Sequence, residues 1–230
     1  MAKAKTIIDD QEIAEAGSFE TNAAAGSKAF DLKYIEEFIE AAGSDDLPTF
    51  GGKFEGGIHC QQISDELAPC ILAIIQSGKV IKSYLEIGVA AGGTTFIINY
   101  FLTPDRIVLI DDNKHHKARL RPGILADVKK EEIIGDSRDK SIVEKAQGIY
   151  DLIIIDGNHL YEGVKADINN YLPMLSEDGF LILHDSALNQ LGVPRAVQEL
   201  KESMELVGEY VTGKHSQPCG VALFRKAIAE

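Results

Sequence analysis

The chain has 230 residues, and its 36 acidic side chains outnumber its 23 basic ones, which gives a net charge of −13 at pH 7. Apolar residues make up 45% and charged residues 26% of the sequence, a balance that excludes an intrinsically disordered protein. No apolar run approaches the roughly 18 residues of a membrane span, and the acidic balance argues against a broad nucleic-acid surface. We therefore expect neither a nucleic acid nor a membrane as partner.

The cysteines and the N-terminus indicate a cytoplasmic protein. Cys60, Cys70 and Cys219 are an odd number at wide spacing, so neither a disulfide framework nor a structural zinc site is expected. The first ten residues lack an apolar core followed by a cleavage site, so they do not form a secretory signal. Three reduced thiols in a reducing cytoplasm are the simplest interpretation.

The N-terminal quarter of the chain differs from the rest. Residues 1–60 hold 12 acids and 5 bases, about half of the charge excess. Residues 1–30 show no sustained hydrophobic period and predict a mobile arm. A helix with one apolar face is predicted next, with Asp31 as its N-cap and Gly43 at its end. We divide the chain into an N-terminal arm or cap with one helix (1–55), which we expect to act as a lid or a subunit contact, and a main domain (56–230).

The segment that joins these parts predicts a loop and a second helix. Proline and glycine mark residues 44–57 as a loop. An apolar helix is expected from about Ser64 to Gln76, although Pro69 fits a helix only near its first turn and leaves the start open.

Beyond residue 82, short apolar runs alternate with helical segments. The predicted strands are 83–87, 106–110, 131–135, 150–156, 180–185, 205–211 and 220–224, and the predicted helices are 92–102, 113–127, 138–147, 160–175 and 193–204. Nearly all-apolar strands separated by helices predict a parallel sheet covered on both faces. The last two strands follow each other without a helix between them. The sequence therefore predicts an α/β, doubly wound, mostly parallel seven-stranded sheet whose last strand is antiparallel.

The first predicted strand ends in a glycine-rich turn, LEIGVAAGGTT. Glycine permits a ligand to approach the main chain, and the helix N-terminus that follows suits an anionic group, although such turns also need glycine for packing alone. The spacing of Gly88, Gly92 and Gly93 departs from the G-x-G-x-x-G fingerprint of dinucleotide-binding proteins. This spacing argues against a nicotinamide-dependent dehydrogenase.

Two further strand tips carry polar side chains. Asp111 ends the second strand, where a carboxylate can accept hydrogen bonds from a ribose diol; a solvated acid is the alternative. Asp136 and Ser137 follow the third strand. They could reach an adenine edge or cap the next helix.

Together these motifs resemble the class I S-adenosylmethionine (SAM)-dependent methyltransferases. The resemblance rests on LEIGVAAGGTT, IDD, IGDS and YDLIIIDGNHLYEGVKADINNYLPMLSEDGFLILHDS, and it covers roughly residues 56–226. The last block is similar to the small-molecule O-methyltransferase branch that includes macrolide-sugar and cephalosporin-hydroxylase-like enzymes. The resemblance implies a Rossmann-like fold, SAM as cofactor, a homo-oligomer, and methyl transfer to a hydroxyl group of a sugar, glycoside or phenol.

The resemblance also implies roles for individual residues. The implied cofactor-binding residues are Glu86, Gly88, Gly92, Gly93, Asp111, Asp136, Ser137 and Asp156. It further implies divalent-metal binding by Asp156, His184 and Asp185, and general-base catalysis by His159. By analogy, Gln61 and Gln62 could touch cofactor or acceptor.

The metal assignment has a physical basis in the sequence. Asp156 and Asp185 end neighbouring predicted strands about 4.8 Å apart, so their carboxylates can converge on one ion. Two carboxylates suit Mg²⁺, and His184 as a third ligand would shift the preference toward Mn²⁺, Fe²⁺ or Zn²⁺. Adjacent strand residues point to opposite faces, so His184 ligates only if the strand has ended there. The alternatives are a hydrogen-bonded His184 and carboxylates that orient the cofactor amine.

His159 is the candidate base because a neutral imidazole can accept a hydroxyl proton near neutral pH. Its alternative is a helix cap or a pocket-lining side chain. Two other functions stay open on the same fold. One is a metal-dependent hydroxylase-like protein whose two histidines and one carboxylate are His159, His184 and Asp185. The other is a non-catalytic SAM-binding relative.

Overall fold

The computed structural model describes residues 30–43, 57–188, 191–212 and 218–227. The predicted N-terminal arm, most of the predicted loop that follows the first helix, and the centre of the loop between the last two strands lie outside the described residues. None of the helices in the described part has the length and apolar character needed to cross a membrane.

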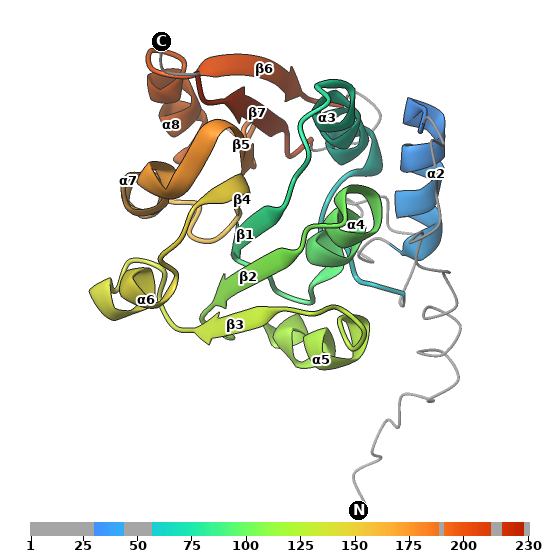
Figure 1. Cartoon of the computed structure of the whole chain (residues 1–230), viewed down its shortest axis with the longest axis horizontal. Coiled ribbons are helices and arrows are strands. Elements are labelled where there is room, and N and C mark those ends of the chain that lie inside the picture. Colours follow the sequence, from blue (N-terminus) through green and yellow to red (C-terminus); the bar gives the residue numbers. More distant parts are fainter. Residues whose placement is uncertain (1–29, 44–56, 189–190, 213–217, 228–230) are drawn as a thin grey trace, which may run out of the picture.

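A seven-stranded sheet forms the centre of the fold (Figure 1). The strands are β1 (Ser83–Ile87), β2 (Arg106–Asp111), β3 (Glu131–Ile134), β4 (Tyr150–Ile155), β5 (Leu175–His184), β6 (Glu205–Tyr210) and β7 (Val221–Arg225). Their order across the sheet is β3-β2-β1-β4-β5-β7-β6. Pairing is parallel from β3 to β5, and β7 runs antiparallel between β5 and β6. The predicted fold class is therefore confirmed.

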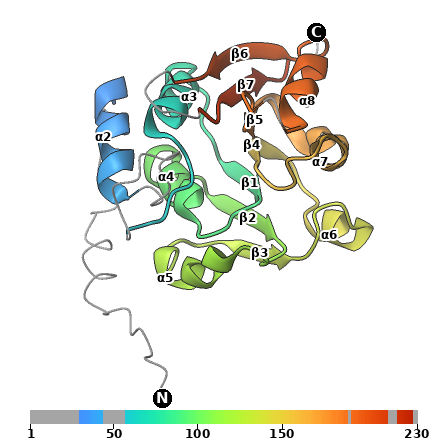
Figure 2. The same ribbon diagram turned by 180° about the vertical axis from the view of Figure 1, so that it is seen from behind.

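Helices cover both faces of the sheet (Figures 1 and 2). The helices are α2 (Leu32–Ala42), α3 (Ser64–Gln76), α4 (Gly93–Leu102), α5 (Arg121–Ile124), α6 (Lys140–Lys145), α7 (Tyr161–Tyr171) and α8 (Val193–Leu200), with 3-10 turns η2 (His116–Leu120) and η3 (Leu172–Met174). Alternate strand residues face opposite ways. One set packs under α2 to α5, and the other packs under α6 to α8.

The first helix ends where the sequence predicts. The Asp31 side chain accepts a hydrogen bond from the Tyr34 N–H at 2.8 Å, and Gly43 ends α2 with a φ of 108°. Phe38 stacks on Tyr100 of α4, with 4.0 Å between ring centroids. Helix α2 thus packs on the same apolar core as α3 and α4.

Prolines explain where helices differ from the prediction. The predicted helix 113–127 is instead the 3-10 turn η2 followed by the four-residue α5, which contains Pro122 and Gly123. Proline lacks an N–H donor and glycine disfavours helix, so a continuous helix is not stable there. By contrast α3 begins at Ser64 and accommodates Pro69 in its second turn, which settles the open start of that helix.

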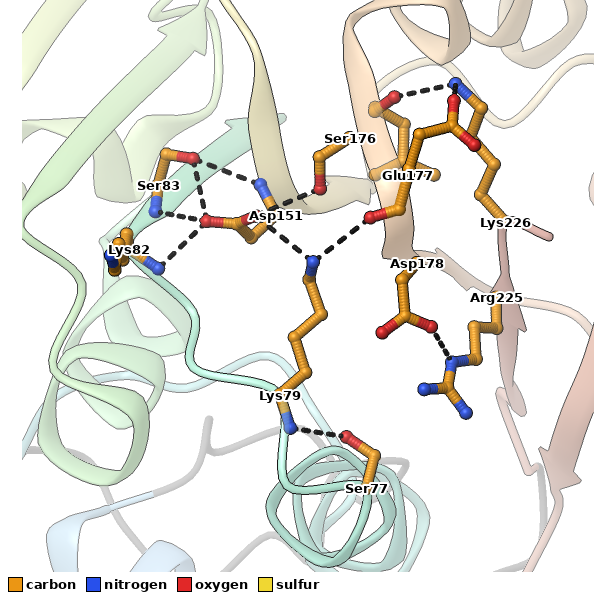
Figure 3. Close-up of polar contacts among 11 residues, drawn as sticks. Ser77, Lys79, Lys82, Ser83, Asp151, Ser176, Glu177, Asp178, Arg225 and Lys226 are labelled. Carbon is orange, nitrogen blue, oxygen red and sulfur yellow. Dashed lines mark hydrogen bonds and ion pairs between the residues drawn. The ribbon is translucent and has the colours of Figure 1, made fainter. Parts of the chain in front are cut away.

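Asp151 ties three strands together at the end of the sheet opposite the predicted site (Figure 3). Its Oδ2 accepts hydrogen bonds from the N–H groups of Lys82 and Ser83 and from the Ser83 hydroxyl, at 3.0 to 3.2 Å. Its Oδ1 accepts the Ser176 hydroxyl at 2.9 Å and lies 3.4 Å from Lys79 Nζ. Burial alone would raise the pKa of Asp151, but these contacts lower it.

The substitution Asp151→Asn is expected to lower the free energy of unfolding by about 2–3 kcal/mol at pH 7. The N–H and hydroxyl groups that donate to the Asp151 carboxylate would lose a charged acceptor. Since the folded-state pKa is lowered, the stabilisation is present above the unfolded value and is lost as the pH falls through the folded one. Asp178→Asn, which breaks a partly exposed pair with Arg225, is the control and should change stability by at most about 1 kcal/mol. Equal effects in urea unfolding would contradict this role for Asp151.

Candidate active site

A cavity of about 510 Å³ lies at the carboxyl ends of strands β1 to β5. Most of the predicted site residues line it: Gly88, Gly93, Asp111, Asp136, Ser137, Asp156, His159, His184 and Asp185. Glu86 and Gly92 lie outside this lining. Open parallel sheets bind ligands at this edge, so the fold brings the predicted residues to one ligand-sized space.

The glycines of the β1–α4 turn are required by the packing of the protein itself. Gly88 has a φ of +83°, and a Cβ there would lie 2.1 Å from the Asp156 carbonyl oxygen. Gly92 is also left-handed, with a φ of +92°. A Cβ on Gly93 would lie 2.5 Å from Cys60 Cα. Any larger residue would therefore clash with the protein's own atoms and disturb the turn, whether or not a ligand is bound.

Glu86 lies beneath this turn rather than in the cavity. It is 1% exposed, and its Oε2 accepts hydrogen bonds from the Tyr84 hydroxyl and, at 2.5 Å, from the Thr95 hydroxyl. Burial raises the pKa of Glu86 to about 8, although the Thr95 and Tyr84 hydrogen bonds oppose this shift. Glu86 thus joins β1 to α4 directly under the turn.

Asp111 is fully engaged by neighbouring groups. Its Oδ2 accepts the N–H groups of Val89 and Ala90 at 2.8 and 2.9 Å, and its Oδ1 accepts the Asn113 N–H at 2.7 Å. Oδ1 also lies 2.9 Å from Nη2 of Arg121, which is 2% exposed. The carboxylate therefore fixes the glycine-rich turn, and a ribose would have to share oxygens that already have partners.

The polar residues after β2 and β3 complete this end of the cavity. Asp112 lines it, and its half-exposed carboxylate is paired with Lys114. Asp136 pairs with the Arg138 guanidinium through both of its oxygens, and these hydrogen bonds lower the pKa of Asp136 to about 2. The N-cap of α6 is Asp139, so neither Asp136 nor Ser137 caps that helix.

Asp156, His159, His184 and Asp185, here called the Asp–His cluster, meet at the other end of the cavity. His184 Nδ1 lies 2.9 Å from Asp156 Oδ1 and 3.5 Å from Asp185 Oδ1. His159 lies between the two acids, with Nδ1 2.9 Å from Asp185 Oδ2 and Nε2 3.3 Å from Asp156 Oδ1. The four side chains therefore form one contiguous ionisable group.

Neighbours His184 and Asp185 both reach the cluster because the strand ends between them. His184 is the last residue of β5, and Asp185 has a φ of +61°, a left-handed conformation that is uncommon outside glycine. Because the strand ends here, the alternation of strand side chains no longer applies to Asp185. This was the condition under which His184 and Asp185 could bind the same ion.

The charges of the cluster reinforce one another. Burial alone would lower the pKa of His159, but hydrogen bonds and charges from Asp156 and Asp185 raise it to about 10. Burial alone would raise the pKa of Asp156, yet the charges and hydrogen bonds of His184 and His159 hold it well below its usual range. The acids of the cluster thus favour the protonated forms of both histidine rings.

Of the two glutamines that the resemblance suggested, Gln61 lines the cavity. Gln62 does not line the cavity; its amide donates to Asp156 Oδ2 at 2.9 Å. The Gly192 N–H donates to the His159 carbonyl at 2.8 Å, and a Cβ on Gly192 would lie 1.9 Å from the Tyr161 nitrogen. These contacts set the orientation of Asp156 and the path of the His159 loop, and they join segments that are distant in sequence.

Comparisons with known proteins agree with this fold. Residues 85–186 match a family model described as a methyltransferase domain. The uncharacterized protein y4gI of Sinorhizobium fredii is 27% identical over 99 residues, which are 43% of this chain and 10% of that protein. The chain thus spans about a tenth of the length of this curated relative.

Solved structures share the fold at low sequence identity. The O-methyltransferase TomG of Streptomyces achromogenes, solved with SAM, aligns with a TM-score of 0.57 at 15% identity over 96% of this chain and 99% of TomG. The N-methyltransferase NodS of Bradyrhizobium japonicum, solved with S-adenosylhomocysteine (SAH), gives 0.53 at 21% identity over 68% and 83% of the chains. MycE of the mycinamycin pathway, solved with Mg and SAH, gives 0.52 at 19% identity over 88% and 56%. The chain therefore has the fold of the class I SAM-dependent methyltransferases, and its residues 85–186 match a methyltransferase domain.

Proposed function

We propose that this protein transfers the methyl group of SAM to a hydroxyl oxygen of a small molecule, such as a sugar, glycoside or phenol. The observation that carries the proposal is one cavity with a glycine-rich turn and acidic strand tips at one end and the Asp–His cluster at the other. TomG and MycE, with which the chain shares its fold, are a named O-methyltransferase and a methyltransferase solved with Mg. The homo-oligomer, the cytoplasmic location and the lid role of residues 1–55 stay predictions.

The turn from Gly88 to Gly93 and the tips of β2 and β3 would hold SAM. Asp111 is the predicted ribose acid, and its contacts with the turn support a role in shaping the main chain against the cofactor. Asp112 lines the same wall with a more exposed carboxylate and is the second candidate for the ribose diol. Asp136 and Ser137 would border the adenine.

Asp156, His184 and Asp185 fit a divalent cation such as Mg²⁺, Mn²⁺ or Fe²⁺. Two observations support this proposal: His184 Nδ1 lies within 3.5 Å of an oxygen of each acid, and Asp156 and Asp185 belong, with His159, to one group of potential metal ligands. When bound, such a cation supplies positive charge that lowers the pKa of a hydroxyl beside it.

In the proposed reaction, the acceptor oxygen forms a bond to the methyl carbon as the carbon–sulfur bond of SAM breaks, leaving SAH. The hydroxyl proton passes to His159 and then to solvent. His159 can accept it only as a neutral ring, which requires that Asp156 and Asp185 be engaged by another positive charge. The remaining work of the protein is to align oxygen, carbon and sulfur.

The substitution His159→Ala is expected to lower methyl transfer by about 10²- to 10⁴-fold, because the proton loses its acceptor. SAH affinity should stay unchanged. The assay follows label from methyl-labelled SAM into a panel of sugars, glycosides and phenols, with divalent cations and with EDTA. His116→Ala, outside the cavity lining, is the control. Full activity of His159→Ala would refute the base assignment, and full activity in EDTA would refute the metal.

One observation favours a second candidate function. The cluster brings His159, His184 and Asp185 together, the two histidines and one carboxylate of a hydroxylase-like iron site. Anaerobic Fe²⁺ binding without methyl transfer to any acceptor would support that function. Methyl transfer dependent on Mg²⁺ would exclude it, and SAH binding without either activity would indicate a non-catalytic relative.

A further inference from the structure

The thiol of Cys219 lies beside the Asp–His cluster, next to His184 and Asp185. Cys219 precedes β7, whose first residue pairs with His184. The Ala187 N–H donates to the Cys219 carbonyl at 2.9 Å, and the next N–H, that of Gly220, donates to the buried Glu66 carboxylate at 2.8 Å. Backbone hydrogen bonds on both sides therefore fix the position of this cysteine.

His184 contacts a thiol within this buried group. The ring is 5% exposed and uses Nδ1 toward Asp156. The Cys219 thiol is close enough to the same ring to form a hydrogen bond with it. A buried imidazole and a buried thiol in contact are two donors that one metal ion can bind together.

Three donors of different chemistry meet at this point. One ligand atom each of His184, Asp185 and Cys219 lies within 4.8 Å of the others, and the three residues are 5%, 4% and 2% exposed. Cys70 is also fully buried, but it is not among the potential metal ligands found in the described residues. A buried cysteine in this fold is therefore not automatically close to other potential metal ligands.

We propose that His184, Asp185 and Cys219 hold a divalent cation of the borderline class, such as Zn²⁺, with Cys219 as a thiolate ligand. Sulfur and imidazole donors select Zn²⁺ or Fe²⁺ over Mg²⁺, which prefers oxygen. Binding forms a metal–sulfur bond and releases the thiol proton to solvent, with no change of oxidation state. This inference rests on the proposed metal role of His184 and Asp185, and it changes both the ligand set and the metal.

The test is spectroscopic and needs no acceptor. Metal-stripped protein is titrated with Co²⁺ under anaerobic conditions. We expect a sulfur-to-cobalt charge-transfer band that Zn²⁺ abolishes, that is lost in Cys219→Ser, and that is retained in Cys70→Ser. Cobalt binding without this band, or a band that survives Cys219→Ser, would overturn the thiolate ligand. No binding of Co²⁺ or Zn²⁺ would overturn the site altogether.

A measurement on the unsubstituted protein covers the case in which Cys219→Ser does not fold. X-ray absorption of the zinc-loaded protein should show a sulfur neighbour at about 2.3 Å. A shell of oxygen and nitrogen only would overturn the inference. SAH binding measured in parallel separates this result from the proposed function, because the cofactor end of the cavity contains none of the three ligands.

Discussion

Replacing Arg121 by methionine is expected to lower the free energy of unfolding by about 3–5 kcal/mol. Arg121 is 2% exposed, its Nη2 lies 2.9 Å from Asp111, and its Nε donates to the Ala90 carbonyl at 2.9 Å. Methionine fills similar space but leaves the buried Asp111 carboxylate without its counter-charge. Because Asp111 also holds the turn through Val89 and Ala90, the same variant should bind SAH more weakly.

Arg138→Met is the matched control, since Arg138 forms an ion pair with Asp136 but its side chain is 46% exposed. An exposed pair contributes about 1 kcal/mol or less. The double variant Asp111→Asn with Arg121→Met should recover part of the lost stability, because no unpaired charge remains. Urea unfolding at one pH measures the free energy of unfolding of each of these variants. Equal stability of the Arg121 and Arg138 variants would show that the buried pair does not anchor the turn.

Raising the pH from 5 to 9 is expected to destabilise the protein more than it destabilises Glu86→Gln. Burial raises the pKa of Glu86 to about 8 from an ordinary value of 4.5, so between these values the folded state holds a proton that the unfolded state has lost. Stability therefore falls as the pH rises through this window. At 1.36 kcal/mol per pKa unit, the variant should gain on the order of 4 kcal/mol relative to the natural chain between pH 5 and pH 9.

Unfolding free energies of the two proteins at pH 5, 7 and 9 check this expectation. Glu144→Gln, at an exposed helix position paired with Lys140, is the control and should follow the natural chain. A constant difference between the natural chain and Glu86→Gln at all three pH values would mean that Glu86 is ionised in the folded state. The buried carboxylate would then require a different account.

The sequence predicts the fold well because its signals are local. Apolar runs such as YDLIII must be buried on both faces, and Asp31 and Gly43 mark helix ends through their own hydrogen bonds and backbone angles. The helix predicted over 113–127 is wrong. The apolar spacing in this segment is typical of a helix, but Pro122 and Gly123 at the start of α5 prevent a continuous one. Here, local breakers outweigh the periodic pattern.

The candidate site is predictable as a set of strand tips but not as a set of contacts. Asp111 forms an ion pair with Arg121. This contact depends on the path of the chain at α5, which the spacing of residues in the sequence does not predict. The φ of +61° at Asp185 lets His184 join the cluster, and this angle is a property of the chain reversal after β5. Cys219 reaches His184 through the pairing of β7 with β5, a contact between residues far apart in sequence.

Titration calorimetry with SAH tests the central claim, that this cavity binds the methyl donor. We predict one SAH bound per chain. Asp112→Asn should weaken binding by roughly 10-fold or more if its carboxylate holds the ribose, since a hydrogen bond to a charged group contributes about 1.5–3 kcal/mol. Asp105→Asn, the same substitution just before the other end of β2, should leave the affinity unchanged. A folded protein that binds no SAH would contradict the account.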